Sequence, residues 1–127
     1  MTLQMPFTLL VALGDSQNKV FHPSTPWIST KDLLRVWPEF EQIASQANFR
    51  AVAALQVCND TSVPGASTEI GTPLTADGKN WGVDFTATSA IANFRYVRFG
   101  WLVWLNSGSS ALFGRCGGEV ALTFDRG

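Results

Sequence analysis

Apolar and polar side chains alternate most clearly between residues 93 and 105. Every second residue from position 97 onward is large and apolar: Val97, Phe99, Trp101, Val103 and Leu105. This two-residue period predicts a β-strand that buries these five side chains. The opposite positions mix aromatic, basic and small residues: Tyr96, Arg98, Gly100, Leu102 and Trp104. Because this second face is neither fully apolar nor fully polar, we expect other groups to pack over part of it.

Shorter stretches with strand character recur along the chain and are separated by clusters of turn-forming residues. These stretches cover residues 7–13, 19–21, 27–28, 49–58, 69–74, 81–86, 111–116 and 120–124. Residues 49–58 are apolar on both faces, which predicts the middle of a sheet, whereas 69–74 is expected to be a short edge strand. Gly117 and Gly118 would permit a bulge or kink between the last two strands.

Residues 33–47 fit two templates. As a strand, the segment places four residues on each face: Leu34, Val36, Pro38 and Phe40 against Arg35, Trp37, Glu39 and Glu41. As a helix, it would begin at Pro38, with acidic residues in its first turn. The strand is favoured because the alternation starts before Pro38, and the proline then suggests an edge strand or a bulge. Residues 45–48 would form a hairpin connection to the next strand.

Seven to nine short strands without a long helical pattern predict an all-β fold, an antiparallel β-sandwich or jelly roll. The chain has 127 residues, close to the usual size of one domain. We therefore expect a single β-sandwich domain over residues 1–127, with an extended N-terminal segment. Cys58 and Cys116 lack C-x-x-C partners, so we expect two reduced, buried thiols, or a disulfide if their strands are neighbours.

The charge pattern argues against polyanionic partners. The formal net charge is −1 and only 15% of the residues are charged, so we expect neither nucleic acid nor an anionic membrane as a partner. The apolar run at 7–13 is too short to span a bilayer, and it lacks the basic residues that precede a secretory signal. We therefore expect no secretory signal and no membrane association.

Reactive side chains do not form a recognisable catalytic motif. His22 is the single histidine, and no nucleophile lies in a motif that would expose it for reaction. Glu39 and Glu41 fit a solvated strand face better than a hydrolytic pair. Asp60 and Asp77 lack the regular spacing of calcium ligands. We therefore predict a non-enzymatic protein without a cofactor or metal.

Aromatic residues provide the best candidates for a functional surface. The chain has five Trp and nine Phe residues, and Trp, Tyr and Arg are the residue types that anchor interfaces or stack on sugars. The interface or ligand-binding candidates on partly polar faces are Trp37, Trp81, Tyr96, Arg98 and Trp104. The alternative is that these side chains form a second hydrophobic layer of the same fold.

Two segments carry a family resemblance. Residues 55–60, with the sequence LQVCND, are followed later by Trp81, and residues 94–99 read FRYVRF. Over residues 49–105 these motifs resemble the strands of discoidin-like (F5/8 type C) jelly rolls, although Cys58 stands where that pattern has serine. The resemblance implies a jelly-roll fold and a carbohydrate-binding module, but it assigns no ligand-binding loop residues here.

The whole chain also resembles the small structural proteins of tailed bacteriophages in its low charge and aromatic content. The prediction is a self-associating structural or surface component of a larger assembly, such as the capsid decoration or tail of a phage virion made in the host cytoplasm. Its partners would be further copies of itself and other assembly proteins. The alternative is the discoidin-like carbohydrate-binding module, with glycans as partners.

Overall fold

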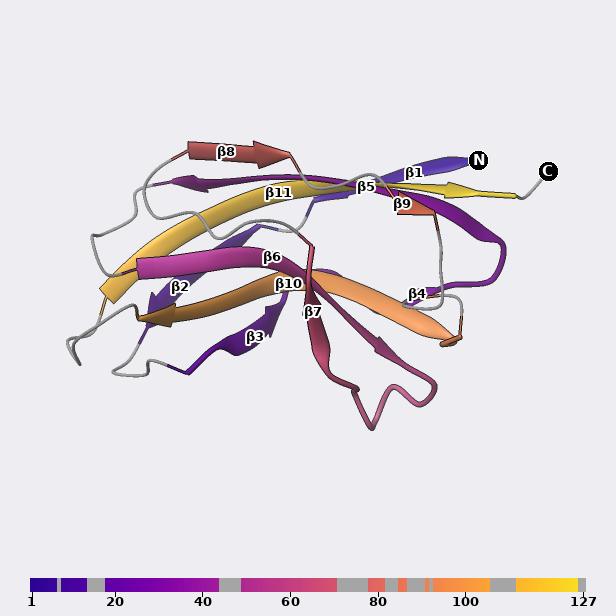
Figure 1. The fold of residues 1–127 in the computed structure, drawn as a ribbon, viewed down its shortest axis with the longest axis horizontal. Coiled ribbons are helices and arrows are strands. Elements are labelled where there is room, and N and C mark those ends of the chain that lie inside the picture. The colour runs from indigo at the N-terminus through magenta and orange to yellow at the C-terminus, as the bar shows by residue number, and fades with distance from the viewer. Residues whose placement is uncertain are drawn as a thin grey trace.

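The computed structural model describes residues 1–6, 8–13, 18–43, 49–70, 78–81, 85–86, 91, 93–105 and 112–125. Their strands form two antiparallel sheets that lie one above the other (Figure 1). The six-stranded sheet contains β1 (Thr2–Pro6), β2 (Leu9–Leu13), β5 (Leu33–Ile43), β8 (Gly78–Trp81), β9 (Phe85–Thr86) and β11 (Leu112–Phe124). The five-stranded sheet contains β3 (Val20–Pro23), β4 (Ile28–Ser29), β6 (Phe49–Cys58), β7 (Ser67–Glu69) and β10 (Tyr96–Leu105).

Three pairs of short strands act as interrupted long ones. β1 and β2 pair with successive parts of β11, β3 and β4 with successive parts of β10, and β8 and β9 with successive parts of β5. If each pair is counted as one strand, the described residues contain eight strands in two four-stranded sheets, ordered 1-8-3-6 and 2-7-4-5 along the chain. Two interleaved sheets of this kind make a jelly roll. The predicted all-β fold class is confirmed.

The core lies between the two sheets. All five apolar residues that alternate along β10 are buried there, and Phe99 and Trp101 have no exposed surface. Ala53 of β6 lies directly beside Trp101, so a small side chain leaves room for the indole. The opposing sheet contributes Leu33, Val36, Cys116, Val120, Leu122 and Phe124.

Residues 33–43 form a strand, as favoured from the sequence, but two details differ. The pairing of β5 with β11 shifts register between Thr123 and Phe124, so Leu33 is buried whereas Leu34 is 47% exposed. β5 lies between β11 and the strands β8 and β9, so the expectation of an edge strand at Pro38 was wrong. Pro38 faces Val120 of β11 on one side, and on the other it falls between the segments of β5 that pair with β8 and β9. The register of β5 with β9 differs by one residue from its register with β8, and a proline is tolerated at such an irregularity.

The connections also differ from the sequence-based expectation. β5 and β6 belong to opposite sheets, so they do not form a hairpin; residues 44–48 lie outside the described part. β11 keeps its register through Gly117 and Gly118, which lie opposite the interval between β1 and β2. The strand expected over 81–86 is divided into β8 and β9. The expected edge strand is β7, which ends at Glu69, whereas residues 71–77 lie outside the description.

The cysteines lie in opposite sheets, Cys58 on β6 and Cys116 on β11, and both are buried free thiols. The expectation of two reduced thiols is confirmed in the structure. Burial raises the pKa of Cys116 to about 12. At neutral pH this thiol therefore behaves as a small apolar group within the core.

Strand β3 approaches β10 unusually closely at Gly100. A Cβ atom at this position would lie 2.1 Å from the carbonyl oxygen of His22 and 2.9 Å from Cα of Pro23. The chain beyond β3 then binds the same strand, because the N–H groups of Ser24 and Thr25 donate to the Phe99 carbonyl at 2.9 and 3.1 Å. The buried hydroxyl of Thr25 accepts from the Phe99 N–H at 2.9 Å. Glycine is therefore required here for close backbone contact.

Candidate functional site

Three of the predicted site residues, Tyr96, Arg98 and Trp104, lie on the outer face of β10. They are half-buried, and the surface around Trp104 is partly a second hydrophobic layer. Val52 and Ala54 of β6 are fully buried on this face, and Leu102 is 7% exposed. Phe21 and Trp104 pack against these three residues. At the Trp104 end of β10, the side chains on the outer face therefore form a second hydrophobic layer of the same fold.

An ion pair crosses the same outer face. Lys19 precedes β3 and Glu69 ends β7, and these strands lie at opposite edges of the sheet. The Lys19 Nζ atom lies 2.6 Å from Glu69 Oε1 and 4.7 Å from the centroid of the Trp104 ring. The ammonium group thus lies close to the indole while its charge is balanced by the carboxylate. Trp104 is held within the fold by this arrangement.

Arg98 lies in a different environment at the other end of the strand. Its guanidinium carbon is 4.3 Å from the Trp27 ring centroid and 5.8 Å from that of Phe21. Nε and Nη2 both donate to Gln56 Oε1, at 2.8 and 2.6 Å, and Gln56 Nε2 donates to the Gly65 carbonyl at 2.9 Å. The guanidinium is therefore oriented by neutral partners. Among the described side chains no carboxylate forms an ion pair with it.

Trp27 was not among the residues predicted from the sequence to form the site. A signal for it exists, because Ile28 packs against the core and adjacent residues of a strand point to opposite faces. Trp27, next to Ile28, is therefore expected on the outer side. The side chain that completes this site, Gln56, alternates with the buried residues Leu55 and Val57 of β6.

The remaining two predicted residues, Trp37 and Trp81, belong to the six-stranded sheet. The structure therefore divides the predicted set between two sheets. Trp37 is 48% exposed and lies beside the small side chain of Ala121 on β11. Glu39 pairs with Glu119 of β11 and with the backbone position of Trp81 on β8. Glu39 and Glu119 are both exposed, so this face carries two carboxylates at directly opposite positions.

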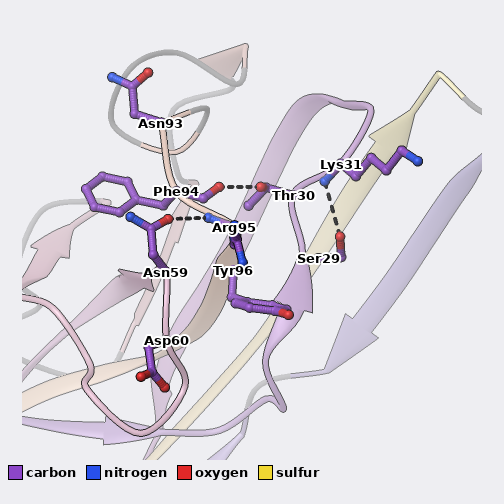
Figure 2. A pocket seen from close by; sticks show the side chains of 9 residues that line it. All are labelled: Ser29, Thr30, Lys31, Asn59, Asp60, Asn93, Phe94, Arg95 and Tyr96. Carbon is purple, nitrogen blue, oxygen red and sulfur yellow. Dashed lines mark hydrogen bonds between the residues drawn. The ribbon is translucent and has the colours of Figure 1, made fainter.

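A hollow of about 730 Å³ lies at one end of the five-stranded sheet (Figure 2). It is lined by residues 29–31, 59–60 and 93–96, which include Tyr96. The backbone N–H of Arg95 donates to Asn59 Oδ1 at 3.0 Å, and the Thr30 hydroxyl donates to the Phe94 carbonyl. These bonds hold the three segments together around the hollow. The mixture of amide, hydroxyl, aromatic and charged groups suits a small polar ligand.

Asp60 lies at the rim of this hollow. Its Oδ1 atom accepts hydrogen bonds from the Ser62 backbone N–H at 3.0 Å and the Ser62 hydroxyl at 2.7 Å. These bonds lower the pKa of Asp60 below its usual value because they stabilise the carboxylate. Asp60 therefore contributes a fixed negative charge to the lining of the hollow, which also includes Lys31 and Arg95.

His22 lies on β3 beside Trp101, and its buried Nε2 atom has no hydrogen-bond partner within the described residues. The described part of the chain contains no group of three or more His, Cys, Asp and Glu residues placed to hold a metal ion. Nor does that part contain a helix long and apolar enough to cross a membrane.

No family model and no curated protein matches the sequence. Solved structures of infectious bursal disease virus have a similar fold. The Gx strain structure has a TM-score of 0.65 at 9% sequence identity and covers 100% of this chain. The Gt strain structure has a TM-score of 0.65 at 9% sequence identity and covers 98% of this chain. The VP2 subviral particle has 0.64 at 11% over 95%. This chain spans about a third of each of those chains, at 32% to 33%. The likeness is one of fold.

Proposed function

We propose that this chain is a non-enzymatic structural protein of a virus particle that associates with further copies of itself. The observation that supports this most strongly is the match of nearly its whole length to chains of infectious bursal disease virus, including a VP2 subviral particle. Two sheets ordered 1-8-3-6 and 2-7-4-5 give the jelly roll that viral capsid domains use.

The outer faces of the sheets support a role in packing. Trp37 is half-exposed on one sheet, and Arg98 is held against Trp27 on the other. Trp and Arg are the residue types most enriched at energetically important interface positions. The low net charge of −1 also permits close packing of many copies without strong mutual repulsion.

The proposed place within a virion rests on the sequence resemblance. The likeness to small proteins of tailed bacteriophages supports a capsid decoration or tail component, made in the host cytoplasm and incorporated into the particle. Other assembly proteins would then be its neighbours. Genes for capsid, portal or tail proteins beside the gene for this chain would support this origin, and a location away from any viral genes would contradict it.

Size-exclusion chromatography with light scattering tests self-association directly. We expect the purified chain to elute as an oligomer whose mass rises with concentration through the micromolar range. A folded species that stays at 13.8 kDa throughout would overturn the proposal. Circular dichroism on the same fractions would establish that the species measured is folded.

A second function, carbohydrate binding, is favoured by the hollow at the end of the five-stranded sheet. Tyr96, Asn59 and Asn93 line it, and aromatic and amide groups are suited to stacking on sugar rings and bonding their hydroxyls. A glycan array followed by tryptophan fluorescence tests this function. Saturable binding that is lost in Tyr96→Ala but kept in Trp37→Ala would support it, and an array without binding would contradict it.

A further inference from the structure

We propose that copies of this chain associate head to tail, with the outer face of the six-stranded sheet of one copy against the outer face of the five-stranded sheet of the next. In this contact Glu39 and Glu119 bind Arg98 of the neighbouring copy. The inference rests on the proposed self-association and specifies which surfaces carry it.

The first surface carries two carboxylates that have no ion-pair partner among the described residues. Glu39 and Glu119 are directly opposite each other on β5 and β11, and both are exposed. Directly opposed like charges destabilise a sheet unless a cation lies near them. Within the described residues neither carboxylate forms an ion pair. The next pair on the same face of these two strands is Trp37 and Ala121, so an exposed aromatic ring lies two residues along β5 from Glu39.

The second surface has an unbalanced positive charge in a fixed position. The Arg98 guanidinium lies against Trp27, and two of its nitrogens bind the neutral Gln56 Oε1. Nη1 makes no hydrogen bond to the described residues, so the group can still bind a carboxylate. Arginine that is already oriented by stacking loses little conformational freedom on binding. This makes it well suited to a pair of carboxylates.

The spacing of charge and aromatic groups corresponds on the two surfaces. Trp37 lies two residues from Glu39 on β5, and Tyr96 lies two residues from Arg98 on β10. Two residues along a strand span about 7 Å. A contact that joins the charged groups therefore places an aromatic side chain of each copy at a similar distance from the ion pair.

The partner is a second copy because the same chain carries both complementary groups, and they lie on different sheets of one molecule. A contact between unlike surfaces is heterologous, so it leaves one free surface of each kind at the ends of the assembly. Repetition generates a closed ring or an open array. Both products suit a component of a particle built from many copies.

Charge reversal with sedimentation equilibrium tests the contact in the full chain. Glu39→Lys and Glu119→Lys change exposed positions, so the fold should be preserved, and each should raise the dissociation constant about 30-fold or more, as for loss of an anchor residue. Asp125→Lys is the matched control, because Asp125 is exposed beyond the end of β11. It should leave association unchanged.

Restored association in a charge-exchanged variant distinguishes direct pairing of these residues from a general effect of net charge. The triple variant Arg98→Glu, Glu39→Lys, Glu119→Lys exchanges the sign of the charge between the two surfaces and should associate again. Arg98→Gln, which replaces the guanidinium by a neutral polar amide, serves if Arg98→Glu alone fails to fold. If the two Glu→Lys variants and Arg98→Gln associate as strongly as the wild type, this contact is overturned while self-association stands. The contact is also overturned if the triple variant folds but does not associate. A wild-type chain that does not associate at all would overturn both proposals.

Discussion

Replacement of Gly100 by alanine should weaken the fold through one specific backbone contact. The added Cβ atom would lie 2.1 Å from the His22 carbonyl oxygen, whereas real Cβ contacts are essentially never under 3.0 Å. Strand β3 would therefore have to move by roughly 1 Å away from β10. Because the obstructing atoms belong to the backbone, a change of side-chain rotamer cannot relieve the clash.

The expected loss follows from the bonds that depend on this approach. The N–H groups of Ser24 and Thr25 bind the Phe99 carbonyl at 2.9 and 3.1 Å, and Phe99 N–H binds the buried Thr25 hydroxyl at 2.9 Å. Each hydrogen bond contributes about 1 kcal/mol, and overpacking alone costs about 1–3 kcal/mol. With the loss of one of these three bonds, Gly100→Ala should therefore lower the free energy of unfolding by about 2–4 kcal/mol.

Urea unfolding followed by tryptophan fluorescence measures this change. The urea concentration at the unfolding midpoint should fall. The slope of the unfolding free energy against urea concentration should stay the same, because the core itself is not rearranged. The control is His22→Ala combined with Gly100→Ala, which removes the imidazole but leaves the carbonyl. Recovery of stability in that double variant, or a loss below about 0.5 kcal/mol in Gly100→Ala, would refute the reasoning.

Three further predictions concern single positions. Burial raises the pKa of Cys116 from 9.0 to about 12. The contribution of this thiol to the free energy of unfolding should therefore be level below pH 9 and fall by about 4 kcal/mol from pH 9 to 12, because the unfolded chain releases the proton first. Cys116→Ala should remove that part of the fall, and identical pH profiles would contradict it. Asp32 has a φ of 63°, so Asp32→Gly should be tolerated and Asp32→Val should cost about 1–2 kcal/mol in urea unfolding; equal stabilities would contradict this. Ala53 is fully buried beside Trp101, so Ala53→Leu should lower the thermal midpoint through about 1–3 kcal/mol of overpacking, whereas an unchanged midpoint would reveal unfilled space.

The fold could be predicted largely from local patterns. Alternation along residues 97–105 identified the core face of β10, because alternate side chains of a strand point to the same face of the sheet. The positions of Leu33 and Leu34 could not be predicted in this way. Their burial depends on a register shift against Thr123 and Phe124 of β11, which lie about 90 residues further along the chain. Such shifts are set by pairing and leave little trace in the local sequence.

The candidate surfaces were predictable only in part. Aromatic and basic residues on the partly polar face of β10 identified Arg98, but its contacts with Trp27 and Gln56 come from strands distant in sequence. The opposition of Glu39 and Glu119 likewise requires the register between β5 and β11. Trp104 matched the same sequence pattern as Arg98, yet it covers a hydrophobic cluster and lies close to Lys19. Residue type alone does not distinguish these two environments.

Sedimentation velocity over a concentration series, with electron microscopy of the same samples, tests the central claim most directly. A structural protein of a virus particle should form discrete larger species as concentration rises, and micrographs should show repeating rings, arrays or shells of one subunit type. A single folded species of 13.8 kDa at every concentration, with no regular particles, would contradict the account.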